Sequence, residues 1–103
     1  MSAPSTPPDL SIAQLQALIR AKYYATDKAR GTPETWMLFI EEVGELSTAL
    51  WEKQRGREDR ANLREEFADV IAWLCTLANI NDVDLTEALA KYTVGKGPEG
   101  TKS

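Results

Sequence analysis

The sequence predicts an all-α fold of four helices, completed by association with further copies of the same chain. Apolar residues recur at helical spacing from about residue 10 to residue 92, and no segment alternates polar and apolar residues with the period of a strand. The chain has 103 residues, enough for one small domain and too few for a second. A domain of this size buries only about 60–65% of its unfolded surface, so self-association is a natural source of further burial.

Local signals place the first two helices. Ser11 and Gln14 form a capping box ahead of apolar residues at helical spacing, which predicts the start of the first helix. This helix should end near residues 30–31. Thr32 then supplies an N-cap, and Pro33 suits the first position of the second helix.

The second half of the chain carries the same kinds of signal. The second helix should stop before Gly56, and the third should begin within residues 59–62 and break at residues 81–82. Asp84 and Glu87 form another capping box, which predicts a short fourth helix.

The two ends of the chain differ in composition from the part between them. Residues 1–9 and 95–103 are rich in Pro, Gly and Ser, so we expect mobile tails around a domain of residues 10–94. No apolar run approaches the roughly 18 residues of a membrane span, and the start of the chain lacks the basic and apolar regions of a signal peptide. A single cysteine, Cys75, excludes an internal disulfide framework. Together these features predict a protein of the reducing cytoplasm.

The charged residues narrow the classes of function. The chain has no histidine, which excludes His-based catalysis and His-containing zinc sites, and its net charge of -4 gives no basic footprint for nucleic acid. Residues 41–69 hold nine acids and five bases, whereas the rest of the chain holds seven of each. The whole net charge therefore lies in this one segment.

Two pairs of acids lie at the edges of the apolar stripes of the second and third helices. Glu42 and Glu45 form an i, i+3 pair on the second helix, and Glu66 and Asp69 form the same pair on the third. If these helices pack through their apolar stripes, the four carboxylates meet at the rim of the interface, which is costly unless a cation is present. Oxygen ligands without Cys or His suit Mg²⁺, with Mn²⁺ as a substitute, and imply a phosphate-bearing substrate. The alternative is that these acids form solvated helix faces.

The two acidic segments together resemble a known family. Residues 41–45 (EEVGE) and 66–69 (EFAD) resemble the E-E-x-x-E … E-x-x-D signature of MazG-like nucleotide pyrophosphohydrolases, of the all-α NTP pyrophosphatase superfamily. The resemblance extends over about residues 10–92. It implies a four-helix fold, obligate dimers or tetramers, and Mg²⁺-dependent cleavage of a (deoxy)nucleoside triphosphate to the monophosphate and pyrophosphate, as in nucleotide-pool sanitation.

The resemblance also implies roles for individual residues. Glu41 matches an extra glutamate, a candidate catalytic residue that contacts a metal or orients the attacking water. Trp73 matches a position where related dCTP-cleaving enzymes place an aromatic ring near the nucleotide, although an aromatic residue at helical spacing also suits a core or an interface. The positions that match the metal ligands of the family are Glu42, Glu45, Glu66 and Asp69.

Basic and aromatic residues provide two further expectations. Lys53 and Lys91 are candidate substrate-binding residues because they could neutralise phosphate charge, with simple solvation as the alternative. Trp36, Trp51 and Trp73 are spread around the two central helices, and one short four-helix unit can hardly cover all three rings. This distribution predicts a homodimer or a homotetramer.

The sequence leaves two other functions open. One is a non-catalytic helical interaction module, in which the acids keep an oligomer soluble or bind a basic partner. The other is an enzyme of the same fold that cleaves a different pyrophosphate bond, such as the one in phosphoribosyl-ATP. A docking surface needs acids that point outward, whereas Glu42 and Glu66 border the core, and this favours an enzyme.

Overall fold

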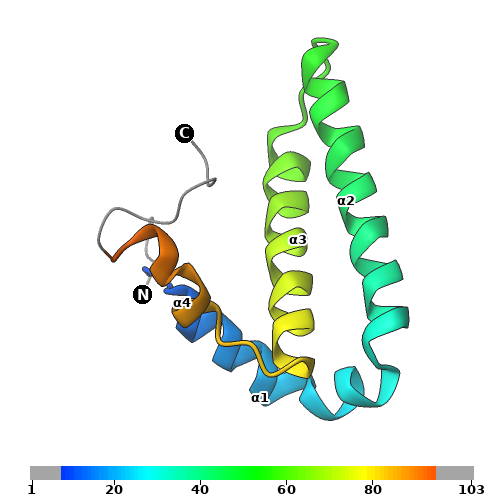
Figure 1. Ribbon diagram of the computed structural model, residues 1–103. Coiled ribbons are helices and arrows are strands. Elements are labelled where there is room, and N and C mark those ends of the chain that lie inside the picture. The colour runs from blue at the N-terminus through cyan, green and yellow to red at the C-terminus, as the bar shows by residue number, and fades with distance from the viewer. Residues whose placement is uncertain (1–7, 95–103) are drawn as a thin grey trace, which may run out of the picture.

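The computed structural model describes residues 8–94 and is all-α, as the sequence predicts, with no strand in this part of the chain. Its elements are α1 (Ile12–Arg30), α2 (Thr32–Gln54), α3 (Arg60–Ile80), α4 (Leu85–Ala88) and the one-turn 3₁₀-helix η1 (Leu89–Tyr92). Helices α2 and α3 form a long antiparallel hairpin, and α1 crosses the end of the hairpin at which α3 finishes (Figure 1). The predicted tails lie outside the described residues, apart from residues 8 and 9.

The start of α1 is held by the predicted capping box. The side chain of Ser11 accepts a hydrogen bond from the backbone N–H of Gln14 at 3.0 Å, and the Gln14 side chain accepts one from the Ser11 N–H at 2.7 Å. These two bonds satisfy donors that a helix start otherwise leaves free. The prediction for this terminus is confirmed.

The junction between α1 and α2 differs from the prediction in one respect. Gly31, not Thr32, is the N-cap of α2; Thr32 is the first helical residue, and no side chain caps this end. Gly31 has φ 84° and ψ 169°, a conformation that only glycine adopts readily, so the turn between the helices falls on this residue. The Thr32 hydroxyl instead accepts a hydrogen bond from the Asn81 side chain at 3.1 Å, which ties the start of α2 to the end of α3.

The boundaries of α3 and α4 follow their predicted signals closely. The Asp59 side chain caps α3 by accepting from the N–H of Asn62 at 3.0 Å, and Asn81 ends the helix. Asp84 caps α4 and accepts from the N–H groups of Thr86 and Glu87. Within residues 8–94, however, the Glu87 side chain makes no bond back to Asp84, so only half of the predicted capping box forms.

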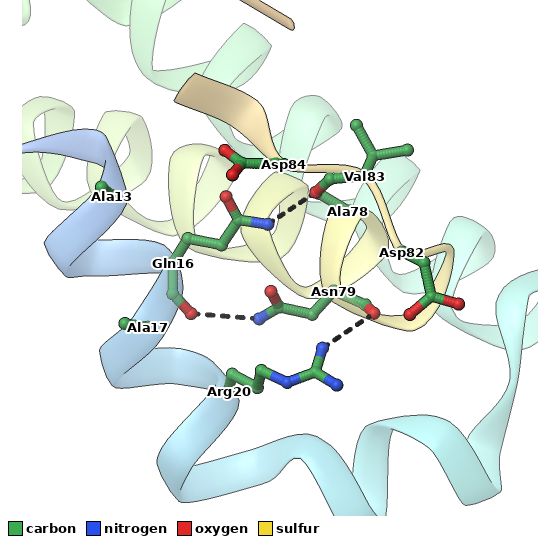
Figure 2. A pocket seen from close by; sticks show the side chains of 9 residues that line it. All are labelled: Ala13, Gln16, Ala17, Arg20, Ala78, Asn79, Asp82, Val83 and Asp84. Atoms are coloured by element: carbon green, nitrogen blue, oxygen red, sulfur yellow. Dashed lines mark hydrogen bonds between the residues drawn. The ribbon is translucent and has the colours of Figure 1, made fainter. Parts of the chain in front are cut away.

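Hydrogen bonds of side-chain amides hold α1 against the end of α3 and the segment that follows it. The Gln16 side chain donates to the carbonyl of Val83 at 2.7 Å and accepts from the N–H of Leu85 at 3.0 Å. The side chain of Asn79 donates to the Gln16 carbonyl at 3.2 Å, and Arg20 donates to the Asn79 carbonyl at 3.3 Å (Figure 2). These bonds line a cavity of about 350 Å³ and fix the position of α1 across the hairpin.

The core of the single chain is small. The buried apolar residues are Ile19, Ala49, Leu63, Cys75, Ala78 and Ile80. Burial raises the pKa of the Cys75 thiol, in keeping with an unreactive core cysteine. In contrast, Trp36 and Trp51 stay 52% and 58% exposed, so one chain leaves its largest apolar side chains uncovered. Among the described helices, none is both long enough and apolar enough to cross a membrane.

The turn at Gly31 yields a test of the fold. Replacing Gly31 with Ala should lower the free energy of unfolding by about 1–3 kcal/mol, because alanine must adopt a backbone conformation that its Cβ disfavours. Thr32→Ala should cost less, because the Thr32 side chain caps no backbone N–H and its hydrogen bond with Asn81 is exposed to solvent. Urea unfolding followed by circular dichroism measures both. A larger loss in Thr32→Ala than in Gly31→Ala would contradict this account of the junction.

Candidate metal centre and active site

The candidate site lies at the edge of the contact between α2 and α3, which we call the rim of the hairpin. Because the two helices are antiparallel and pack along much of their length, the middle of α2 faces the first half of α3 (Figure 1). Each helix carries an acid pair at i and i+3, one turn apart and on the same side. Packing of the apolar stripes therefore carries both pairs to the same level of the hairpin.

Three of the four predicted metal ligands converge. Glu42, Glu45 and Glu66 each offer one carboxylate oxygen, and these oxygens all lie within 4.8 Å of one another. Two oxygens that share one Mg²⁺ at about 2.1 Å lie at most about 4.2 Å apart, so only a slight approach of the side chains is needed. Glu66 is buried, with 8% of its surface exposed, whereas Glu42 is half-buried and Glu45 is exposed. The cluster thus opens to solvent on its Glu45 side.

The other two predicted acids lie beside this cluster. Asp69 is half-buried and outside the group of three, but its charge is close enough to raise the pKa of both Glu42 and Glu66. Glu41 is exposed and also lies outside the group. Asp69 is therefore placed to contribute to a shared ion, whereas Glu41 is connected to the cluster only as the chain neighbour of Glu42.

The cluster is short of positive charge and of hydrogen-bond donors. Burial, followed by the charge of Glu45, raises the pKa of Glu42 and of Glu66 above the ordinary value of 4.5. One oxygen of each, Oε2, is buried and accepts no hydrogen bond from any residue that the structure describes. The ion pairs formed within residues 8–94 involve other acids. Buried carboxylate oxygens without partners are rare and costly in proteins, and a bound divalent cation would satisfy both.

The donor set agrees with a hard cation. The converging groups are carboxylates, without a thiolate or an imidazole, and Mg²⁺ and Mn²⁺ favour this chemistry. Mg²⁺ typically retains water and takes part of its coordination from substrate phosphates, which the open Glu45 side of the cluster permits. The residues present therefore fit a divalent metal site.

The predicted substrate-binding residues are placed less uniformly. Trp73 is half-buried and lines a cavity of about 310 Å³ between α1 and α3. Lys53 is exposed near the end of α2, two turns beyond Glu45. Lys91 is exposed on η1, which packs on α4, and α4 packs on α1. Within one chain, therefore, Lys91 is not brought to the acids.

Sequence reasoning missed a buried ion pair on α1. The Asp27 side chain, only 7% exposed, pairs with Arg30 at the wall of the Trp73 cavity. The signal was present in the sequence, since Asp27 and Arg30 continue the stripe that begins at Ile19 and Tyr23 with spacings of i+8 and i+11. A charged pair within an apolar stripe indicates a buried or functional contact.

A helical hairpin with a carboxylate cluster at the edge of its helix contact defines the class as an all-α protein with a candidate oxygen-ligand metal site. The MazG nucleotide pyrophosphohydrolase domain matches residues 32–95, more than half of the chain and the whole of α2, α3 and α4. The chain belongs to the MazG nucleotide pyrophosphohydrolase family. Comparison with curated proteins finds no significant match.

The raised pKa values lead to a test of the cluster without any substrate. Both carboxyls hold protons more tightly in the folded state, so their contribution to stability is present below pH 4.5 and is lost as the pH rises through the folded pKa values. Replacing Glu42 or Glu66 with Gln should therefore stabilise the metal-free protein at pH 7 and flatten its pH dependence. Melting in EDTA between pH 4.5 and pH 8 measures this.

Glu41→Gln is the matched control, because Glu41 is adjacent in sequence but exposed and outside the cluster. Its melting temperature should stay close to that of the wild type. If Glu42→Gln and Glu66→Gln are both less stable than the wild type at pH 7, the two carboxylates are partnered in the folded protein and the cluster is not strained.

Proposed function

We propose that this protein is a Mg²⁺-dependent pyrophosphohydrolase that converts a (deoxy)nucleoside triphosphate to the monophosphate and pyrophosphate, in nucleotide-pool sanitation. One observation carries the proposal: within a MazG domain, two buried carboxylate oxygens, of Glu42 and Glu66, have no hydrogen-bond partner among the described residues and lie beside a third acid. This supports a metal-dependent site and argues against acids that merely coat a surface, since surface acids keep their hydration.

The residues that would hold the metal are Glu42, Glu45, Glu66 and Asp69. A bound Mg²⁺, or Mn²⁺ in its place, supplies charge neutralisation at the phosphates and lowers the pKa of a bound water. The protein positions the carboxylates. Glu66 is buried, and Glu45 is exposed on the side from which the substrate would bind. Carboxylate oxygens that already lie within 4.8 Å of one another need only a small rearrangement to hold the ion.

The remaining acid and the two lysines complete the proposed reaction. Glu41, on the solvent side, accepts a hydrogen bond from the attacking water and orients it toward the α-phosphorus. The water oxygen forms a bond to the α-phosphorus and its released proton passes to solvent, while the bond from the α-phosphorus to the bridging oxygen breaks and pyrophosphate leaves with the electron pair. Lys53 and Lys91 bind phosphate oxygens; since one chain keeps η1 apart from α2, Lys91 does so across a contact between chains. Trp73 lies against the nucleotide.

The assembly proposed for this activity is a homodimer or a homotetramer. Large apolar side chains recur at helical spacing on α2 and α3 and are exposed in the single chain. They are Trp36, Ile40, Val43 and Leu50 on α2, and Phe67, Ile71 and Leu74 on α3. These side chains stay exposed beside the contact between α2 and α3. They need a further helix to cover them, and the rest of the described chain does not supply one. A second copy presents the same two stripes and can cover them symmetrically.

Activity is tested with a panel of nucleoside triphosphates in Mg²⁺ and with pyrophosphate release as the readout. The wild type should release pyrophosphate, and Glu45→Ala and Asp69→Ala should lower kcat by about a hundredfold or more, because each removes a carboxylate that would hold the cation whose charge stabilises the transition state. Glu34→Ala is the control, since Glu34 is an exposed acid in the first turn of the same helix as Glu45. Its activity should match the wild type.

A second measurement separates a metal site from a surface of acids. Millimolar Mg²⁺ should raise the melting temperature of the wild type, because the ion binds only the folded arrangement, and Glu45→Ala should lose most of this gain. If neither Mg²⁺ nor Mg²⁺ with nucleotide changes the melting of the wild type, the acids do not form a metal site and the interaction module becomes the better description.

The oligomer is tested by sedimentation. At micromolar concentration the protein should have two or four times the chain mass of 11.4 kDa, because the apolar stripes are covered by other copies. Ile71→Lys should shift the protein toward the single chain by placing a charge in the contact. Val83→Lys, at an exposed apolar residue outside α2 and α3, should not. A wild type that sediments as a single chain would contradict the assembly.

A further inference from the structure

The cavity between α1 and α3 has the properties of a small ligand site. Its volume of about 310 Å³ lies at the lower end of the range for small-molecule pockets. Its wall combines the aromatic rings of Tyr23 and Trp73 with a small number of polar groups, chiefly Asp27, Arg30 and Thr76. A mostly apolar wall with a few fixed polar groups is typical of a site that orients a flat organic molecule.

One buried polar atom of Asp27, a residue of this wall, lacks a hydrogen-bond partner within residues 8–94. Asp27 is 5% exposed, and its Oδ1 accepts hydrogen bonds from the guanidinium of Arg30. The other oxygen, Oδ2, is buried and accepts no hydrogen bond from any residue between 8 and 94. A buried acceptor of this kind calls for an N–H or O–H donor from outside the chain.

Another cavity, the one shown in Figure 2, provides the contrast. In the cavity of Figure 2, the Gln16 amide both donates and accepts, and the Asn79 side chain donates to the Gln16 carbonyl. Within the described chain, the buried polar atoms without partners do not include any from its wall. That cavity is explained by its role in fastening α1, whereas the Asp27 cavity is not explained by the fold.

The Asp27 cavity also lies at a suitable distance from the acids. Trp73 follows Glu66 by seven residues, which places it on the same side of α3 and two turns away, or about 10 Å along the helix axis. The span of a nucleotide from its α-phosphorus to the far edge of its base is of this order. The guanidinium of Arg30 lies over the Trp73 ring at 5.2 Å from its centroid and holds the ring against this wall.

We propose that the α1–α3 cavity receives the base of the nucleotide and that Asp27 selects bases that carry an exocyclic amino group. This inference rests on the proposed function. Oδ2 can only accept, and an amino group offers N–H donors that project beyond the ring. Uracil and thymine place a carbonyl oxygen there, and their ring N–H is flanked by two such oxygens that the carboxylate repels. The family match starts at residue 32 and so does not cover Asp27 or Arg30.

The test compares substrates that differ at the amino group. For the wild type, kcat/KM should be at least about tenfold higher for CTP than for UTP and for ATP than for ITP, the difference expected from one charged hydrogen bond. Asp27→Asn should bring both ratios to one or below, because its amide oxygen keeps Arg30 while its NH₂ group now points into the cavity as a donor. Asp9→Asn, at an exposed position ahead of α1, should leave the ratios unchanged.

Binding measured without turnover keeps the base site distinguishable from the reaction. In calorimetric titrations, CMP should bind more tightly than UMP to the wild type, and Asp27→Asn should remove this difference. Trp73→Leu should weaken both nucleotides by a similar factor of about ten, because stacking is largely independent of the base. Circular dichroism and sedimentation show that each variant retains its fold and assembly.

Each outcome decides between the two proposals. If CMP is preferred over UMP but no triphosphate is hydrolysed, the base site stands and the proposed reaction fails. If triphosphates are hydrolysed with the same base preference in the wild type and in Asp27→Asn, the reaction stands and the inference is overturned. It is also overturned if neither monophosphate binds, or if Asp27→Asn changes the oligomer without changing base preference, because Oδ2 is then met by another copy of the chain.

Discussion

The packing of α2 against α3 forces like charges together, and the rest of the structure depends on that constraint. Apolar stripes drive the two helices into contact, and the acids at the edges of those stripes are carried along. The result is a rim where Glu42 and Glu66 lose hydration without gaining a donor from the described chain. The hydrophobic contact between the two helices thus outweighs the repulsion and lost hydration of these carboxylates. A cation that binds them removes this unfavourable free energy, which strengthens its binding.

The same hairpin explains why α1 is held by polar bonds. The single-chain core is small, so apolar burial alone does little to fix the angle between α1 and the hairpin. The side-chain amides of Gln16 and Asn79 fix this angle because their hydrogen bonds have a defined geometry. Since Asp27 and Arg30 lie on α1 and Trp73 on α3, these amides also set the shape of the cavity between them. A rigid wall is what a site needs to discriminate between bases.

Chain-local features were predictable because they depend on a few neighbouring residues. The Ser11 capping box and the Asp59 and Asp84 caps each require one side chain to reach an N–H two or three residues away. The junction at Gly31 was predicted one residue late. There the backbone conformation, set by how α1 and α2 meet, outweighed the capping preference of threonine. The Asp27–Arg30 pair was not predicted although it continues the apolar stripe of α1, because its burial depends on residues 72–76 of α3, more than forty positions further along the chain.

The sequence by itself determined the class of fold, the position of three helix starts, and the pairing of acids at i and i+3 on two helices. Periodicity and capping depend on residues within one or two helical turns, so the order of residues along the chain is enough to predict them. Only the tertiary structure decided that Glu42, Glu45 and Glu66 converge while Glu41 does not, and that one oxygen of Asp27 has no partner among the described residues. These facts depend on the angle and register between helices, which packing sets and periodicity leaves undetermined.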